Sequence, residues 1–216
     1  MGVVVSVVGS VKPSPHALAL AGVDLPAARP PLLRVLPANE VVVVLPRSRS
    51  PQREVYLEVC ERDGVPVIVR PSGGGAVVLS PGVVTVSVLA PSAQSGLAPE
   101  PHFARMSDVV IAALAACGVT CVTRRGVSDL CLGERKVAGA ALRLWGGRVL
   151  YQISLLVEAD LALIDRYLPM PSREPDYRRR RPHSEFVTSL RRAGFAASVE
   201  AVAGALHDAF TLHLAG

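Results

Sequence analysis

Aromatic and charged residues are scarce in this chain, and each shortage excludes a class of protein. Only 4% of the 216 residues are aromatic and 19% are charged, while half are hydrophobic. This composition argues against a stacking platform for single-stranded nucleic acid and against a disordered chain. No apolar run reaches the roughly 18 residues that a membrane span requires. We therefore expect one compact domain over residues 1–216 that binds neither nucleic acid nor membrane.

Lysine is nearly absent as well. Lys12 and Lys136 are the only lysines among 23 basic residues, and the rest are arginine. The net charge of +5 is compatible with an anionic ligand or partner but does not require one. Lysine is a compact point charge that can be aimed at a single oxygen, whereas arginine is a planar fork. The internal Lys136 is therefore a candidate for a specific role.

Metal-binding and secretory signals are also missing. The four cysteines, Cys60, Cys117, Cys121 and Cys131, show no CxxC or Cys/His spacing, and each has apolar neighbours. We expect buried, reduced thiols and assign no protein metal site. The N-terminal segment lacks the charged region of a signal peptide. A cytoplasmic protein is the expectation.

Short apolar runs rich in valine predict strands, and a few longer segments predict helices. Strands are expected at 32–36, 41–45, 65–70, 76–80 and 83–89, and several more between 121 and 157 with turns at residues 125–126, 133–134 and 146–147. Helices are expected at 50–63, 102–116, 160–168, 185–192 and 198–214, and a loop at 92–101. Because strands mostly follow each other directly, we predict an α+β fold with a mixed, largely antiparallel sheet.

A run of three glycines stands out in VRPSGGGAVV, residues 69–78. The run has neither the GxGxxG spacing nor a following Gly-Lys-Ser/Thr, which excludes the two common phosphate-binding loops. A strand-to-strand turn is predicted, in which Gly73, Gly74 and Gly75 let the backbone approach a ligand and point N–H groups at it. Arg70 and Ser72 would flank that ligand. A bend without any ligand is the alternative.

A second motif, SDLCLGERKVAGAALR, covers residues 128–143. Lys136 follows the predicted turn at 133–134, and the small residues Gly139, Ala140 and Ala141 leave room beside it. This pattern suggests a ligand cavity in which an ammonium group stabilises a developing oxyanion. The alternative is an exposed lysine on a hairpin.

The two motifs, in this order and followed by HSEFVTSL at 183–190, resemble the lipoate-protein ligase A family, whose wider group includes biotin ligases and octanoyltransferases. The resemblance runs from about Leu33 to the end of the chain. It implies the biotin/lipoate ligase catalytic fold, which is similar to class II synthetases, without the accessory C-terminal domain of some ligases. It also implies joining of lipoate or octanoate to ATP, with Mg²⁺ at the phosphates, and transfer of the acyl group to a lysine of an acidic lipoyl-acceptor domain. A monomer is expected.

The resemblance also assigns roles to particular residues. Lys136 would be the catalytic residue that contacts the acyl carbonyl and a phosphate oxygen, and Asp129 would lie near the adenylate. The residues implied to bind substrate or nucleotide are Arg70, Ser72, Gly73, Gly74, Gly75, Ala76, Val77, Asp129, Gly139, Ala140 and Ala141.

Some positions differ from the ligase pattern and keep alternatives open. Leu79 and Ser80 replace a His-Asp pair, and YQISL at 151–155 replaces His-His-Gly-Thr-Leu. One alternative is an ATP-independent octanoyltransferase with Cys121 as nucleophile, although its strand-like context predicts a buried thiol of poor reactivity. Another is a degenerate member that only binds an acyl group or a partner. The arginine run at 178–181 is either a solvated face or a surface for the acidic acceptor or for the phosphates.

Overall fold

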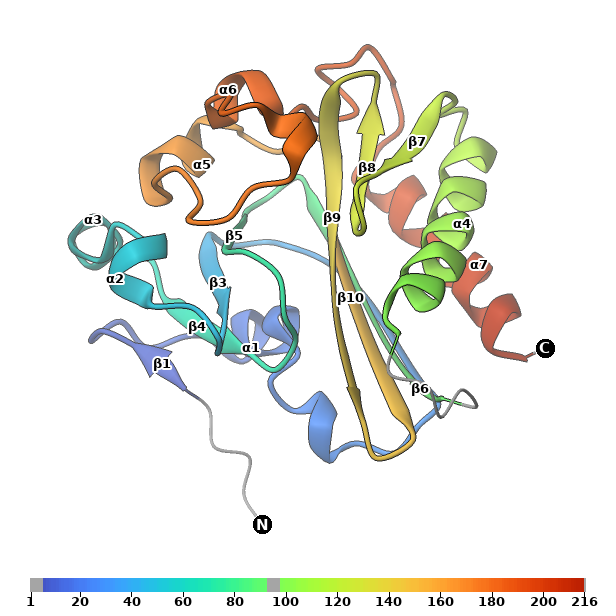
Figure 1. Cartoon of the computed structure of the whole chain (residues 1–216), viewed down its shortest axis with the longest axis horizontal. Coiled ribbons are helices and arrows are strands. Elements are labelled where there is room, and N and C mark those ends of the chain that lie inside the picture. Colours follow the sequence, from blue (N-terminus) through green and yellow to red (C-terminus); the bar gives the residue numbers. More distant parts are fainter. Residues whose placement is uncertain (1–5, 93–97, 216) are drawn as a thin grey trace.

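The strands form two sheets in the computed structural model, which describes residues 6–92 and 98–215 (Figure 1). The larger sheet has six strands in the order β2-β6-β10-β9-β8-β7, all paired antiparallel. The smaller sheet has the order β1-β4-β3-β5, and β3 and β4 are parallel. The predicted α+β fold is confirmed, with the strands divided between two sheets.

The elements have the following bounds. The larger sheet contains β2 (Leu32–Pro37), β6 (Val83–Pro91), β7 (Val122–Arg125), β8 (Asp129–Leu132), β9 (Arg135–Trp145) and β10 (Arg148–Leu156). The smaller sheet contains β1 (Val7–Val8), β3 (Val42–Pro46), β4 (Val67–Arg70) and β5 (Val77–Leu79). The α-helices are α1 (Pro15–Ala21), α2 (Pro51–Glu54), α3 (Leu57–Arg62), α4 (Glu100–Ala116), α5 (Ala162–Tyr167), α6 (His183–Phe186) and α7 (Val199–Ala215), with 3₁₀ turns η1 (Leu25–Ala27) and η2 (Asp176–Arg178).

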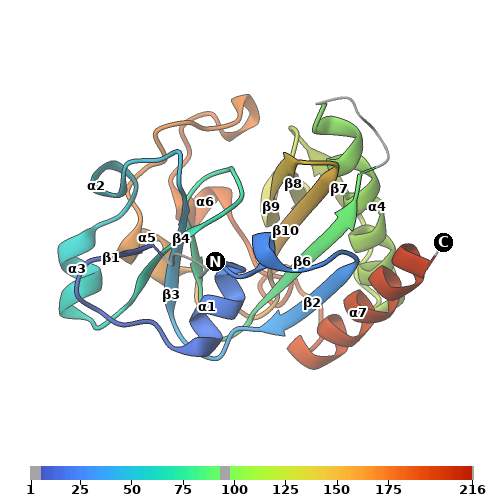
Figure 2. The ribbon, with the colours of Figure 1, turned by 90° about the horizontal axis from the view of Figure 1, so that it is seen from below.

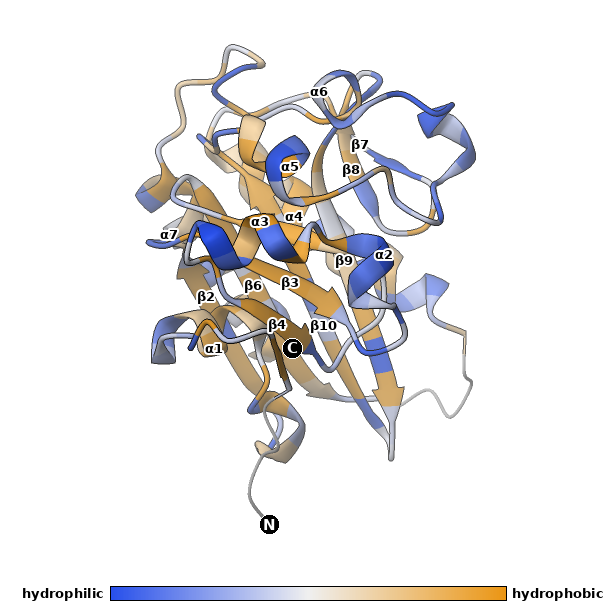
Figure 3. Cartoon of the chain, turned by 90° about the vertical axis from the view of Figure 1, so that its left-hand side faces the viewer, coloured by the Kyte–Doolittle hydropathy of each residue, from blue (hydrophilic) through white to orange (hydrophobic). Residues whose placement is uncertain are grey.

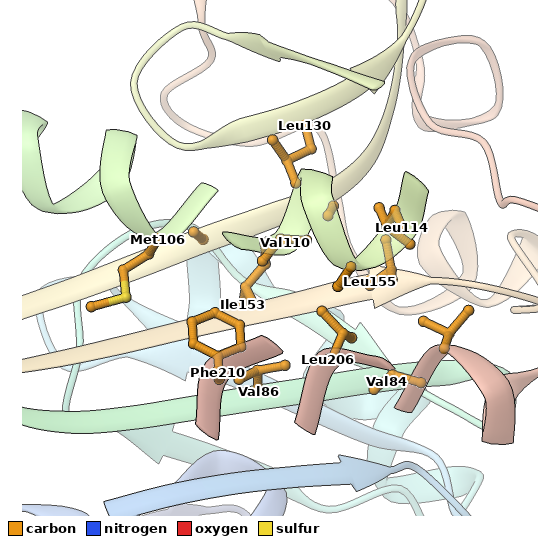
Figure 4. Packing of buried hydrophobic residues seen from close by; sticks show 14 of the residues in the cluster. Val84, Val86, Met106, Val110, Leu114, Leu130, Ile153, Leu155, Leu206 and Phe210 are labelled. Carbon is orange, nitrogen blue, oxygen red and sulfur yellow. The ribbon is translucent and has the colours of Figure 1, made fainter. Parts of the chain in front are cut away.

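Helices α4 and α7 cover one face of the larger sheet, and the smaller sheet lies on its other side (Figure 2). Val110 of α4 and Leu206 and Phe210 of α7 pack on Val86 and Ile153 of the sheet (Figure 4). Complete burial of such a side chain contributes about 1.5–3 kcal/mol, so this cluster is a main source of stability. The strands are the most hydrophobic parts of the chain, and α2, α3 and α5 carry hydrophilic residues (Figure 3). Within residues 6–92 and 98–215, no helix is long and apolar enough to cross a membrane.

Two predicted helices differ from the structure because tertiary contacts decide the backbone. The helix expected at 50–63 is broken between α2 and α3, where Val55 is extended and buried, and Tyr56 N donates to Tyr167 O at 2.9 Å. The helix expected at 185–192 is only the single turn α6. Beyond it Val187 pairs in parallel with Lys136, so the chain joins the larger sheet.

Helix α1 was not expected, although the sequence contains its signals. Ser14 Oγ accepts from Ala17 N at 3.0 Å, Pro15 begins the helix, and Gly22 ends it at a φ of 64°. These are the usual N-cap, first-turn proline and C-terminal glycine. Half of the loop expected at 92–101, residues 93–97, lies outside the described part of the chain, and α4 already begins at Glu100.

Candidate functional site

The two predicted motifs meet at the walls of two adjoining cavities. The outer cavity has a volume of about 370 Å³ and extends under α5 and α6, and the inner cavity of about 130 Å³ extends toward α1. Residues of the glycine turn, of the β8–β9 hairpin and of β10 line both, namely Gly74, Gly75, Ala76, Val77, Ser128, Asp129, Lys136, Gly139 and Ser154. Residues about 60 positions apart in the chain therefore share one wall.

Lys136 is fixed in position at this wall. Its Nζ lies 2.7 Å from Asp129 Oδ1, and the Tyr177 hydroxyl donates to Asp129 Oδ2 at 2.7 Å. The aspartate side chain is 9% exposed and the lysine side chain 27% exposed. The ammonium thus pairs with one carboxylate inside the protein and faces the cavities on its other side. A freely exposed hairpin lysine would have no such partner.

A bulge and a glycine give the lysine this position. The register between β8 and β9 shifts between Leu130 and Cys131, so Asp129 lies opposite Gly139 while Cys131 lies opposite Lys136. A Cβ atom at Gly139 would lie only 2.6 Å from Lys136 Nζ. The ammonium occupies the space that a side chain at position 139 would fill. The small residues after the lysine predict that such a space exists.

Arg70 holds the glycine turn from inside the protein. It is buried, and its guanidinium donates to Ser72 Oγ at 3.1 Å, Val44 O at 3.3 Å and Gly75 O at 2.7 Å, and also to Gly73 O. Burial lowers the pKa of Arg70 to about 10, so the group remains charged at neutral pH. Arg70 lines the inner cavity, but most of its hydrogen bonds shape the turn.

Gln152 of β10 is one of the polar residues that sequence reasoning missed. Its Oε1 accepts from Ser72 Oγ at 2.6 Å, and its Nε2 donates to Ala21 O at 3.1 Å and Ser87 Oγ at 3.2 Å. The amide thus joins the glycine turn, α1 and β6. Side chains alternate along a strand, so Gln152 and Ser154 share the face opposite to that of Ile153. This alternation within YQISL is a signal that could have identified both residues.

Ser72 and Gly73 line neither cavity, in contrast to the expectation that they contact the ligand. Ser72 donates to Gln152, and Gly73 N donates to Leu142 O of β9 at 3.3 Å. Ala140 and Ala141 line only the inner cavity. Ser72 and Gly73 therefore attach the turn to the larger sheet, and Gly74, Gly75, Ala76 and Val77 form the cavity wall.

Replacing Arg70 by methionine is expected to lower the free energy of unfolding. The buried carbonyl group of Val44 would lose the Arg70 donor, and an unsatisfied buried polar group costs about 1–3 kcal/mol. Urea unfolding would measure the change, with the exposed Arg47→Met as control. Equal stability of the two variants would contradict the role of Arg70 in holding the turn.

The cysteines do not supply a nucleophile at this wall. Cys121 is exposed, with a φ of 64°, so the expectation that it is buried is wrong. Cys121 comes directly before the first residue of β7. Asp129 pairs with Arg125 at the other end of this strand, so Cys121 is distant from Asp129. Cys131 is buried with its Sγ 3.5 Å from the Tyr177 hydroxyl, and burial raises its pKa. None of the four cysteines, all within the described residues, lines either cavity.

The arginine run at 178–181 divides into two pairs. Arg178 is buried, and its guanidinium lies 4.7 Å from the centre of the Phe186 ring. Arg181 also lies over this ring and donates to Glu134 O at 3.0 Å. Arg179 and Arg180 are exposed. The run therefore contains one buried arginine, one partly buried arginine and two exposed ones, and the expected acceptor surface stays a prediction for Arg179 and Arg180.

The residues present do not form a magnesium site. Both oxygens of Asp129 already accept hydrogen bonds, from Lys136 and Tyr177. Within the described ranges, no cluster of three or more His, Cys, Asp or Glu side chains could hold a metal ion. A magnesium ion at this site would have to enter with a nucleotide, bound to its phosphates.

Comparison with known proteins gives consistent matches. The model of the lipoyl protein ligase A/B catalytic domain matches residues 21–211. Lipoate–protein ligase 2 of Staphylococcus aureus is 30% identical over 126 residues, which are 58% of this chain and 36% of that protein. The octanoyl-[GcvH]:protein N-octanoyltransferase of Geobacillus kaustophilus is 32% identical over 126 residues, 55% of this chain and 44% of that protein. The matches thus span less than half of these relatives.

Solved structures agree in fold over nearly the whole chain. A bipartite lipoate protein ligase from Thermoplasma acidophilum superimposes with a TM-score of 0.75 at 23% identity, covering 94% of this chain and 81% of that one. A lipoate-protein ligase A bound with ATP gives a TM-score of 0.75 at 25% identity, covering 92% of this chain and 81% of that one. With the family model matching most of its length, the chain belongs to the lipoyl protein ligase A/B catalytic domain family.

Proposed function

We propose that this chain joins lipoate or octanoate to ATP as an acyl-adenylate and then transfers the acyl group to a lysine of an acceptor domain. The observation that carries the proposal is the position of Lys136, which Asp129 holds at the wall shared by the inner and outer cavities. Family membership and the ATP-bound relative support this chemistry.

The inner cavity suits the acyl tail. Leu20, Val44 and Leu79 give it an apolar end. Each methylene that leaves water contributes about 0.8 kcal/mol, so an eight-carbon chain gains most of its affinity there. The carboxylate of the acid then lies at the level of Lys136, where the two cavities meet.

The outer cavity suits the nucleotide. Arg49 and Arg173 line it together with Lys136, so its wall offers several cations to phosphate groups. A carboxylate oxygen of the acid attacks the α-phosphorus of ATP, and pyrophosphate leaves with the bonding electrons. The Lys136 ammonium stabilises the negative charge that develops between the carboxylate and the phosphate, without reorganising, because Asp129 already orients it.

The positions of the cysteines favour the ATP-dependent route over octanoyl transfer through a thioester. An acyl-enzyme requires a thiol at the acyl site. Cys121 lies outside both cavities, and the buried Cys131 has a raised pKa. The residues that replace the usual His-Asp pair, Leu79 and Ser80, are buried, and Leu79 belongs to the apolar end of the inner cavity.

One assay tests the proposal and separates it from the alternatives. The purified chain would be incubated with octanoate or lipoate, ATP, magnesium and an isolated lipoyl domain, and pyrophosphate release and the mass of the domain would be followed. Pyrophosphate release that depends on the acid supports the proposal. Acylation from an octanoyl thioester without ATP would establish the transferase instead, and acyl binding without any turnover would establish a binding protein.

The exposed arginines of the turn that follows η2 predict how an acidic acceptor docks. Replacing Arg179 and Arg180 by glutamine removes two exposed charges, each worth about 0.2–1 kcal/mol in a surface ion pair. The KM for the lipoyl domain is therefore expected to rise about 2- to 30-fold at low salt. The difference from wild type should shrink as salt screens the charges.

The control removes two arginines elsewhere. Arg62 and Arg143 are also exposed and line neither cavity. The double variant Arg62→Gln and Arg143→Gln has the same net charge as the test variant. An equal rise of KM in both would mean that overall charge, rather than this surface, attracts the acceptor.

A further inference from the structure

His183 is a buried histidine on the wall of the outer cavity, close to Lys136 in the fold. It is the first residue of α6, and Phe186 and Val187 line the same cavity. Val187 pairs with Lys136, and Thr188 N donates to Lys136 O at 2.8 Å. The backbone of β9 therefore anchors the segment that carries His183, and the imidazole and the ammonium belong to one site.

The hydrogen bonds of His183 determine its tautomer. The Nε2 atom lies 3.1 Å from Pro169 O, and a carbonyl oxygen can only accept. The proton of the neutral ring is therefore assigned to Nε2, and Nδ1 is left as an acceptor. Within residues 6–92 and 98–215, Nδ1 has no hydrogen-bond partner. A proton acceptor without a partner thus belongs to the wall of the outer cavity, which Lys136 also lines.

The surroundings of the ring, and burial above all, favour its neutral form. Burial lowers the pKa of His183, and the Arg178 and Lys136 cations lower it further, while the Pro169 carbonyl and the Asp165 carboxylate act in the opposite direction. A neutral imidazole at pH 7 is the form that can take a proton.

The acceptor amine needs such a group. A lysine amine has a pKa of about 10.4 in water, so almost all of it is protonated and cannot attack a carbonyl at neutral pH. Lys136 is itself a cation paired with Asp129 and cannot take that proton. Asp129 has both oxygens occupied.

On the basis of the proposed function, we infer that His183 is the general base that accepts the proton of the acceptor lysine through Nδ1. Nδ1 takes one proton of the lysine ammonium, which frees the lone pair of the nitrogen. The neutral amine nitrogen then attacks the acyl carbonyl, a C–N bond forms, and the bond from the carbonyl carbon to the phosphate oxygen breaks. The electron pair of the broken bond leaves with AMP, and the second proton that the nitrogen loses goes to water.

The variant His183→Gln isolates this role. The glutamine amide nitrogen can still donate to Pro169 O, but the side chain has no basic nitrogen. Synthetic octanoyl-adenylate would be supplied to the folded enzyme, with Nα-acetyl-lysine as one acceptor and hydroxylamine as the other. Hydroxylamine is largely uncharged at neutral pH, so its nitrogen needs no base to free the lone pair before it attacks. Both products would be quantified by mass spectrometry in single-turnover reactions.

Transfer to Nα-acetyl-lysine is expected to slow about 10²-fold in His183→Gln, while hydroxamate formation stays at the wild-type rate. Below the pKa of His183, wild-type transfer to the lysine should fall as the ring becomes protonated, and this decrease should be absent from the variant.

Equal rates of transfer to lysine by wild type and variant would overturn the inference. An equal loss of rate with both acceptors would also overturn it, because that result indicates a role in positioning the adenylate. If the proposed function itself is wrong, the result is different. The wild-type enzyme would then acylate neither acceptor faster than octanoyl-adenylate does without enzyme.

Discussion

Replacing Lys136 by methionine is expected to lower the rate of acyl-adenylate formation about 10²- to 10³-fold, the usual cost of removing one donor from a developing oxyanion. Methionine keeps an unbranched apolar stem in the space beside Gly139 and removes only the charge. Pyrophosphate release at saturating ATP and octanoate would measure the loss. Because the interaction forms with the developing charge, the change should appear in kcat more than in KM.

The matched control for this variant is Lys12→Met. Lys12 is the other lysine of the chain, is exposed, and lies outside both cavities. The variant is expected to retain the wild-type rate. If folded Lys136→Met also keeps its rate within a factor of about 3, which is less than 1 kcal/mol of barrier, the ammonium does not act in the reaction.

Loss of the ammonium has a second consequence that must be separated from the first. Asp129 would become a buried carboxylate without its cation, which lowers stability. The double variant Lys136→Met and Asp129→Asn removes that unpaired charge and keeps a group that can accept from Tyr177. Its melting temperature should exceed that of Lys136→Met, while its rate stays low. If the double variant recovered both the melting temperature and the rate, the single variant would have been slow only because it was destabilised.

The local backbone structure around the two motifs was predictable from the sequence, while the roles of their residues in binding stay predictions. The glycine turn, the hairpin that carries Lys136, and the small residues beside it all lie where their motifs indicate. Each depends on backbone freedom or on side-chain size within a few residues. The structure adds the reason for one of them, because Gly139 leaves the volume that Lys136 Nζ fills.

The parts that depend on distant contacts were not predictable. The direction of the Arg70 side chain follows from carbonyl groups of β3 and of the turn, and no local pattern encodes it. Gln152 reaches three separate segments, which only the packed structure brings together. Cys121 reads as part of an apolar strand, yet the chain turns there between α4 and β7 and exposes it. Propensity describes a residue's neighbours in the chain, whereas these outcomes depend on neighbours in space.

Replacing Gly139 by alanine is expected to lower the rate of acyl-adenylate formation about 10²-fold while the protein stays folded. The added Cβ would lie 2.6 Å from Lys136 Nζ and 2.7 Å from its Cε, so the ammonium must move away from Asp129. A misplacement of about 1 Å can cost 10²-fold in rate. The displaced atoms are the end of a flexible side chain, so the melting temperature should change little. Pyrophosphate release and thermal melting would measure the two effects.

The control is Gly204→Ala in α7, where a Cβ would meet no atom within 4 Å. Alanine there should leave the rate unchanged and stabilise the helix by about 0.5–1 kcal/mol. Full activity of Gly139→Ala would show that the lysine works equally well from another position, which contradicts a fixed ammonium. The double variant Gly139→Ala and Lys136→Met gives the final test. If both substitutions remove the same interaction, the double variant should be about as slow as Lys136→Met, because the two losses do not add.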